Sequence, residues 1–250
     1  MSRLKKSSRP SDEQNYAPIP QETAHYTTKT GIRKAVRIIP RNIHQESYLE
    51  ALLDDSKIVV IANGPAGCGK TYLGMLAGIK MFSEKSVSKI ILCRPNIGVD
   101  DNDIGFLPGD VTDKMYVWVR PMLDVLFEYY SKKDIENMID VGTLEFAPLM
   151  HMRGRNIKNT FVILDESQNA SISECKSILT RLCEGSKLIM TGDNDQSDRK
   201  NFENGLLFLQ NSLEKFGGSK YIDCINFDFK DIERHPVVKD VLEIFKQSGK

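Results

Sequence analysis

The sequence predicts an α/β fold in which helices cover both faces of a mostly parallel β-sheet. Two observations carry this prediction. Short runs of apolar, often β-branched residues alternate along the chain with longer segments whose apolar positions recur every three to four residues. Several of the runs are continuously apolar, as expected for strands buried on both faces, and helical crossovers between parallel strands bury them in that way.

Seven segments are predicted as strands. The clearest contains Ile-Val-Val-Ile-Ala directly before a glycine-rich turn, and the last one alternates in polarity, which predicts an edge or late strand. The predicted strands are residues 35–39, 57–62, 89–93, 143–146, 160–164, 187–191 and 221–229.

Five segments show the periodicity of amphipathic or buried helices. The longest contains Pro121, which predicts an interruption there. The predicted helices are residues 42–53, 71–82, 110–130, 172–182 and 237–246.

Length and composition predict a single globular domain over residues 31–250, because 250 residues of which 40% are hydrophobic and 27% charged suffice for one sizeable core. Residues 1–30 are rich in Ser, Thr, Pro and Gln and are predicted to form a mobile tail. The net charge of +0 excludes a basic field over the whole protein, so any nucleic-acid contact must be local.

The chain is expected to be cytoplasmic. Its five cysteines are odd in number and form no CxxC pair, which predicts reduced thiols. No run reaches the roughly 18–20 apolar residues of a membrane span, and the polar N-terminus does not resemble a secretory signal. We therefore expect no membrane partner.

The segment from Gly64 to Thr71 matches G-x-x-x-x-G-K-[ST], the P-loop or Walker A motif, and lies between a predicted strand and helix. Glycines let successive main-chain N–H groups point at phosphate oxygens, and the helix dipole adds to their attraction. Lys70 is expected to reach the β- and γ-phosphates, and the Thr71 hydroxyl to hold Mg²⁺. The predicted nucleotide-binding residues are Gly64, Pro65, Ala66, Gly67, Cys68, Gly69, Lys70, Thr71 and Tyr72.

Two carboxylates follow the predicted strand 160–164. Asp165 is expected to hold Mg²⁺ through water, and Glu166 to orient or deprotonate an attacking water. Their place at the carboxyl end of a parallel strand is where ligands bind in open α/β sheets. A nucleotide kinase has no need of the adjacent glutamate, so the pair favours hydrolysis.

Three further polar residues are candidates around the nucleotide. Gln196 follows the strand 187–191 and is predicted to sense the γ-phosphate. Gln45, about twenty residues before the P-loop, carries an amide that could read adenine as donor and acceptor. Arg234 is a candidate for stabilising γ-phosphate charge in the transition state.

Taken together, these motifs resemble the PhoH-like ATPases of bacteria and their phages, and the resemblance spans about residues 35 to 246. Its most specific parts are Gly-Phe-Leu-Pro-Gly-Asp at 105–110, Met-Arg-Gly-Arg at 152–155 and Arg-His-Pro at 234–236. Cys68 replaces the usual Thr, and Ser167 stands where Ala is common. The resemblance implies a P-loop NTPase with a RecA-type core, related to the first motor domain of superfamily 1 helicases.

The predicted function is a Mg²⁺-dependent ATPase that converts ATP to ADP and phosphate and is coupled to RNA or single-stranded nucleic acid, in a helicase-like manner. Trp118 beside Arg120 is the one suggestive aromatic–basic pair for such coupling. An alternative is an ATP-gated homo-oligomeric assembly protein without translocation, and a small-molecule kinase is a third interpretation.

One P-loop in one core predicts that a neighbouring subunit completes the site, as in a head-to-tail ring of six. Arg234 is the first candidate for an arginine acting on a neighbour, with Arg153 and Arg155 behind it, and the alternative is that Arg234 acts within its own chain.

Overall fold

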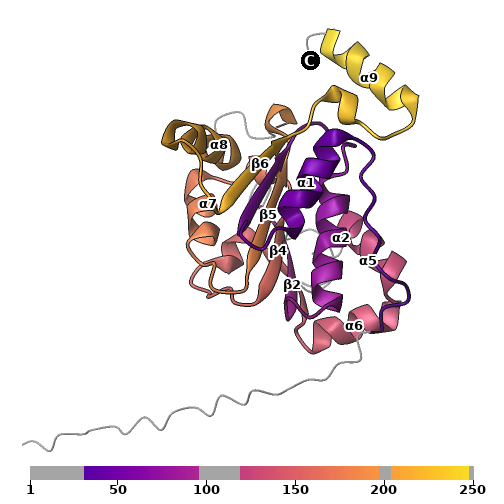
Figure 1. Cartoon of the computed structure of the whole chain (residues 1–250), viewed down its shortest axis with the longest axis vertical. Coiled ribbons are helices and arrows are strands. Elements are labelled where there is room, and N and C mark those ends of the chain that lie inside the picture. The colour runs from indigo at the N-terminus through magenta and orange to yellow at the C-terminus, as the bar shows by residue number, and fades with distance from the viewer. Residues whose placement is uncertain (1–30, 96–118, 197–203, 248–250) are drawn as a thin grey trace, which may run out of the picture.

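The computed structural model describes residues 31–95, 119–196 and 204–247. The predicted tail over residues 1–30, the first part of the predicted helix 110–130, Trp118 and the motif at 105–110 lie outside the described residues. The described strands form one six-stranded sheet in the order β3-β2-β4-β5-β1-β6 (Figure 1). The strands are β1 Val59–Asn63, β2 Lys89–Arg94, β3 Leu144–Pro148, β4 Thr160–Leu164, β5 Lys187–Gly192 and β6 Ile222–Asn226.

All five strand pairs are parallel. The carboxyl ends of the strands therefore meet at one edge of the sheet. The P-loop strand β1 is separated by β5 from β4, the strand that ends before Asp165. The predicted α/β class with a mostly parallel sheet is confirmed.

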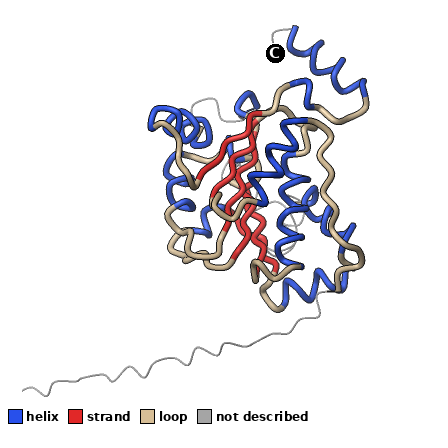
Figure 2. The backbone as a smooth tube through the Cα atoms, viewed as in Figure 1, coloured by secondary structure: helices blue, strands red, loops and turns tan. Residues whose placement is uncertain are grey.

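Helices cover both faces of the sheet (Figure 2). One layer holds α1, α2, α5 and α6, and the other holds α7 and α8, while α9 stands apart from both. The bounds are α1 Ile43–Leu53, α2 Lys70–Ser83, α5 Arg120–Tyr129, α6 Lys132–Asp140, α7 Ile172–Leu179, α8 Gly205–Phe216 and α9 Pro236–Gln247. None of the helices in the described ranges is long and apolar enough to cross a lipid bilayer.

Each strand contributes to two separate hydrophobic cores. On β1, Val60 and Ala62 belong to the core under α1, α2, α5 and α6, whereas Val59 and Ile61 belong to the core under α7 and α8. Successive side chains point to opposite faces of a strand, so a strand covered on both sides must be apolar at nearly every position. This explains the continuous apolar runs in the sequence.

The predicted strand at 35–39 is wrong. The segment has no regular secondary structure and pairs with none of the described strands, and Val36 and Ile38 instead pack beside the α1–α2 core. Nearby, the Arg33 main-chain N–H donates to the carbonyl of Tyr129 at the end of α5. Alternating apolar residues thus line the helical layer here rather than a sheet.

Two helices were not predicted, and two predicted elements are shorter. Helix α6 begins at a capping box between Ser131 and Asp134, and α8 ends at Gly217, whose φ is +85°. Helix α7 stops three residues before the predicted 182, and the Thr180 hydroxyl donates to the carbonyls of its last turn. Strand β6 ends at Asn226, short of the predicted 229, and a 3₁₀ turn, Phe229–Asp231, follows.

Candidate active site

A cavity of about 560 Å³ opens at the carboxyl ends of β1, β4 and β5. Its volume lies in the range of ordinary small-ligand sites. Residues predicted from separate motifs meet around it, although they lie up to about 190 positions apart in the chain. Among those lining the cavity are Gln45, Ala66, Gly67, Gly69, Lys70, Thr71, Tyr72, Asp165, Glu166, Gln196 and Arg234.

The P-loop has the backbone that its glycines allow. Gly64, Gly67 and Gly69 have φ values of +144°, +96° and +84°, a region that side chains with a Cβ strongly disfavour. Helix α2 starts at Lys70, and no side chain caps it. The first N–H groups of α2 thus have no side-chain cap, and the first residues of the helix line the cavity, as a phosphate site requires.

Lys70 lies folded against its own loop. Its Nζ donates to the carbonyls of Gly64 at 2.6 Å and Pro65 at 2.8 Å. Burial lowers the pKa of Lys70 from its ordinary value. The negative charges of Asp193, Asp165 and Glu166 oppose this shift. A terminal phosphate in the cavity would offer the ammonium group a charged partner in place of two neutral carbonyls.

Thr71 and Asp165 form the part of the site that suits a divalent cation. The carboxylate Oδ1 of Asp165 accepts hydrogen bonds from Thr71 Oγ1 at 2.9 Å and from Thr191 Oγ1 at 2.6 Å. Asp165 is buried, and hydroxyl and carboxylate oxygens are the donors that Mg²⁺ prefers. The residues therefore fit a magnesium ion at the start of α2.

Glu166 is held by two side chains. Its Oε1 accepts from Arg94 Nη2 at 3.0 Å, and its Oε2 accepts from Gln168 Nε2 at 2.6 Å. Its φ of +55° and ψ of +38° are left-handed, which is uncommon for a residue with a side chain and costs roughly 1 kcal/mol or more. Such strain is typical of functional positions, and Glu166 lines the cavity.

Gln168 joins the ends of two strands. Besides holding Glu166, its Oε1 accepts the main-chain N–H of Asp193, the residue after β5, at 3.1 Å. A Cβ on Gly192 would lie 2.8 Å from that Oε1, so a larger residue there would displace the Gln168 amide. Burial raises the pKa of Asp193, which also lines the cavity.

Sequence reasoning did not assign roles to Arg94, Thr191 and Asp193. All three stand at the carboxyl ends of strands, and Arg94 and Asp193 line the cavity. Each is a polar residue that ends an apolar strand run, the same signal that identified Asp165. The order of the strands, which the sequence does not reveal, decides that these ends are neighbours.

Gln45 reaches the cavity, but its amide is already bonded to main chain. Its Oε1 accepts the N–H of Arg41 at 2.9 Å, and its Nε2 donates to the Cys68 carbonyl at 3.0 Å. It is 4% exposed. The contacts place Gln45 as a support of the P-loop, and adenine recognition by its amide stays a prediction.

Tyr72, Gln196 and Arg234 are exposed residues of the cavity lining. Gln196 ends the turn after β5, and Arg234 follows the 3₁₀ turn after β6. Of the other candidate arginines, Arg155 is bound to Glu145 through both terminal nitrogens, and neither it nor Arg153 lines the cavity. The roles assigned to these side chains stay predictions.

Comparison with known proteins identifies the family. The model of the PhoH-like protein family matches residues 37–246. The chain belongs to the PhoH-like family. A PhoH-like protein of Bacillus subtilis (strain 168) is 36% identical over 223 residues, which cover 89% of this chain and 67% of the relative. Protein PhoH of Escherichia coli K12 is 35% identical over 211 residues, covering 83% of this chain and 58% of the relative.

Two solved helicase structures also resemble the chain. The UvsW helicase of bacteriophage T4 aligns with a TM-score of 0.43 and 15% identity, covering 76% of this chain and 61% of that chain. The Pif1 helicase of Candida albicans aligns with a TM-score of 0.37 and 18% identity, covering 76% of this chain and 40% of that chain. Scores this low identify no activity for a PhoH-like protein.

Proposed function

We propose that this chain binds ATP with Mg²⁺ in the cavity and hydrolyses it to ADP and phosphate. The observation that carries the proposal is the convergence of Lys70, Thr71, Asp165 and Glu166 on one cavity from two strand ends that β5 separates. The P-loop lysine and the magnesium residues would suit any P-loop protein. Glu166 is the group that favours water as the acceptor of the phosphoryl group.

Each group of the chain has a defined task in this proposal. The P-loop N–H groups and Lys70 hold the β- and γ-phosphates, and Thr71 with Asp165 holds the magnesium ion, which would neutralise charge on the phosphate oxygens. Glu166 accepts a proton from, or orients, the attacking water, and Arg94 and Gln168 fix its carboxylate. Arg234 lies at the same cavity and would stabilise charge on the γ-phosphate.

Phosphate release tests this proposal. We expect Lys70→Ala to lose ATP binding and turnover, and Glu166→Gln to keep binding while its kcat falls about 10²–10⁴-fold. Glu184→Gln is a matched control because Glu184 is exposed and lies outside the cavity. Turnover that survives Lys70→Ala at the wild-type rate would refute the proposal.

Coupling to RNA or single-stranded nucleic acid is the finer part of the proposal. Its support is the family and the predicted sensor Gln196, which lies beside the cavity at the end of β5 and is suited to link nucleotide state to motion. ATPase rates with and without single-stranded RNA and DNA test it. Rates that no polynucleotide alters would remove the coupling.

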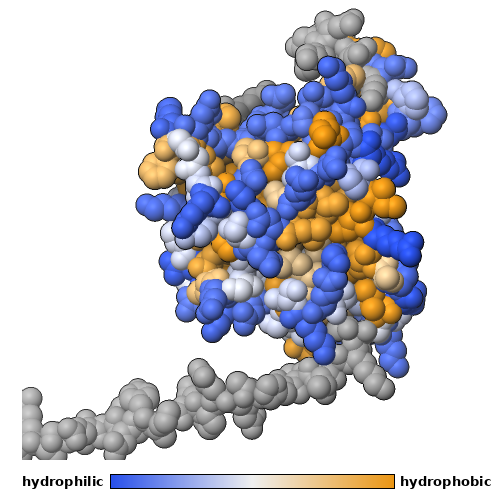
Figure 3. Space-filling view, in the orientation of Figure 1, coloured by the Kyte–Doolittle hydropathy of each residue, from blue (hydrophilic) through white to orange (hydrophobic). Residues whose placement is uncertain are grey.

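The alternative, an ATP-gated homo-oligomer, is favoured by a separate observation. Helix α9 stands apart from the two helical layers and exposes Val237, Val241 and Ile244 at the spacing of one helical face. Figure 3 shows further apolar side chains gathered over the α1–α2 side of the molecule. A ring of copies would bury such surfaces, and light scattering with and without ATP tests for it.

Arg234 lies at the cavity of its own chain, which supports action within one subunit. Mixing Arg234→Ala subunits with Lys70→Ala subunits distinguishes this from action on a neighbour. A site shared between subunits restores hydrolysis in the mixture, and a site within one chain does not.

A further inference from the structure

The segment from Phe227 to Arg234, here called the strap, crosses the P-loop. At its start, the Phe227 N–H donates to the carbonyl of Asn63 at 2.7 Å. A Cβ added to Gly64 would lie 2.4 Å from the Phe227 carbonyl oxygen. The two main chains therefore touch where the P-loop begins.

The strap also contacts the middle of the P-loop. The Glu233 N–H donates to the carbonyl of Gly67 at 3.1 Å. A Cβ at Gly67 would lie 3.0 Å from Arg234 Cγ, so the aliphatic part of Arg234 rests on this glycine. The position of Arg234 is thus set by how the strap lies on the loop.

Asp231 fixes the strap from the other side. Its side chain is 6% exposed, and its Oδ2 accepts from His44 Nδ1 and from the Asp228 N–H at 2.7 Å. The His44–Asp231 distance is 2.6 Å, and Asn42 Nδ2 approaches the Asp231 carbonyl at 3.4 Å. A buried carboxylate with a short side-chain hydrogen bond is costly to leave unpaired.

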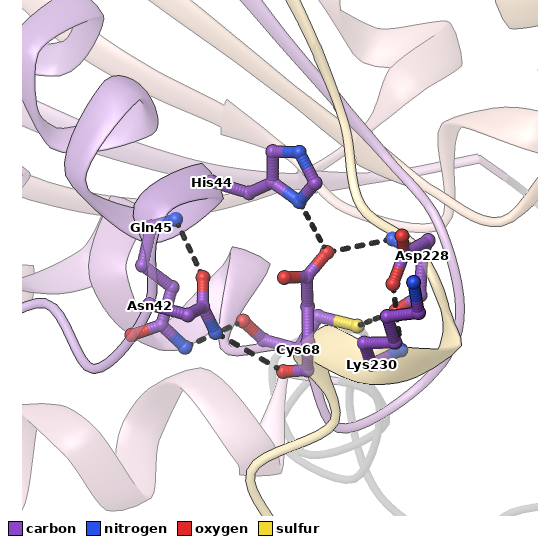
Figure 4. Close-up of polar contacts among 7 residues, drawn as sticks. Asn42, His44, Gln45, Cys68, Asp228 and Lys230 are labelled. Atoms are coloured by element: carbon purple, nitrogen blue, oxygen red, sulfur yellow. Dashed lines mark hydrogen bonds and ion pairs between the residues drawn. The ribbon is translucent and has the colours of Figure 1, made fainter.

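These contacts close a circuit of three segments (Figure 4). Asn42 and His44, at the start of α1, bind the strap. Gln45, the next residue of α1, donates to the Cys68 carbonyl of the P-loop. Cys68 Sγ in turn lies 3.7 Å from the Asp228 carbonyl of the strap. Movement of any one segment must therefore break a bond to another.

A metal site does not explain the cluster better. Ligand atoms of His44, Asp228 and Asp231 lie within 4.8 Å of one another. Yet His44 Nδ1 and Asp231 Oδ2 are bonded to each other, and Asp228 Oδ1 accepts the Lys230 N–H at 2.6 Å. Hydrogen bonds within the protein already account for the arrangement.

We propose that the His44–Asp231 pair is a positioning element that seats Arg234 against the P-loop. Neither side chain lines the cavity, so the pair acts through Arg234 and does not touch nucleotide. The inference rests on the proposed hydrolysis. It adds that a residue of α1, which precedes the P-loop, controls the position of Arg234, which follows the last strand.

Kinetics on a double-mutant cycle test the proposal. We expect His44→Ala to lower kcat about tenfold or more with little change in KM, and Arg234→Ala to lower it further, to about 10²–10³-fold. In the Arg234→Ala background, His44→Ala should then change kcat less than twofold, because its target is gone. His44→Asn, which keeps a donor near the position of Nδ1, should recover most of the rate.

Several outcomes would overturn the positioning role. Equal effects of His44→Ala with and without Arg234 would show that the pair merely stabilises the fold. The same conclusion follows if His151→Ala, an exposed histidine far from the strap, lowers kcat equally. Turnover that persists in Lys70→Ala in the same assay would instead refute the hydrolysis on which the inference rests.

Hydrogen exchange provides a readout that needs no turnover. The Glu233 amide, bonded to the Gly67 carbonyl, should exchange at least tenfold faster in His44→Ala than in the wild-type protein, and His44→Asn should restore its protection. Amides of β3, at the opposite edge of the sheet from β6, should be unchanged. Unaltered protection at Glu233 would overturn the proposal whether or not the chain hydrolyses ATP.

Discussion

Two arginine–carboxylate clusters lie on neighbouring strands, and they differ in how fully their charges are paired. Glu145 on β3 accepts from both terminal nitrogens of Arg155, at 2.5 and 2.8 Å, and from Lys89 at 2.5 Å. The guanidinium of Arg94, at the end of β2, is shared between two carboxylates. Its Nη2 lies 3.0 Å from Glu166 Oε1, and its Nε lies 3.6 Å from Asp165 Oδ2. Only the second cluster lines the cavity.

The difference separates a structural cluster from one suited to a ligand. The hydrogen bonds from Arg155, opposed by burial and aided by Lys89, lower the pKa of Glu145 to about 2. The charge of Glu145 is therefore paired with Arg155 and Lys89 of the same chain. The carboxylates beside Arg94 line the cavity, and their oxygens have lone pairs that a cation and a water molecule could use in addition to the protein partners.

The largest expected effect concerns the shared cluster. Glu166→Gln should lower kcat about 10²–10⁴-fold with little change in KM for ATP, because the amide cannot take a proton from water. Steady-state phosphate release measures both constants. A matching fall in Glu145→Gln, at a temperature where that variant is folded, would erase the distinction between the clusters.

The paired cluster should affect stability instead. Arg155→Ala should lower the free energy of unfolding by about 2–3 kcal/mol, because it leaves a partly buried carboxylate with Lys89 alone. Urea denaturation measures the loss. Lys132→Ala, which removes an exposed ion pair with Glu136, should cost less than about 0.5 kcal/mol and serves as the control.

Acid should weaken the paired cluster in a defined range. The pKa of Glu145 is lower in the folded protein than its ordinary 4.5, so its contribution to stability is complete above that pH and is lost as pH falls through about 2. The difference in unfolding free energy between the wild-type protein and Glu145→Gln should therefore shrink by about 1–3 kcal/mol across this range. A difference independent of pH would contradict the assigned pairing.

The smallest expected effect concerns Gln45, whose side-chain amide is already hydrogen-bonded to the main chain of Arg41 and Cys68. Gln45→Ala should raise KM for ATP and for GTP by similar factors, about three- to tenfold, because it loosens the P-loop through the Cys68 carbonyl. Parallel titrations with the two nucleotides measure this. A rise confined to ATP would show that the amide reads adenine, as the sequence predicted.

The sequence predicted most of the sheet because its strands are buried on both faces and read as unbroken apolar runs. It misplaced 35–39, where the same residue types pack against helices without a pairing partner. Helices α6 and α8 were missed although the sequence carries signals for both, because each begins at a cap, Ser131 or Asn204, that is followed by an amphipathic pattern.

The candidate site also has one part that the sequence could identify and another that it could not. The glycine spacing of the P-loop and the acids after β4 are local signals, so the sequence could identify them. The support of Glu166 by Arg94 and Gln168, and the hold of His44 on Asp231, depend on strand order and on a return of the chain over the P-loop. No local pattern encodes such contacts.

Calorimetric titration of the protein with ATP and Mg²⁺ tests the central claim most directly. The wild-type protein and the Glu184→Gln control should bind one ATP per chain. Lys70→Ala should bind ATP at least about 10²-fold more weakly, because Lys70 is the only lysine among the described residues that line the cavity. Absence of ATP binding by the folded wild-type protein, or unchanged affinity in Lys70→Ala, would contradict the account.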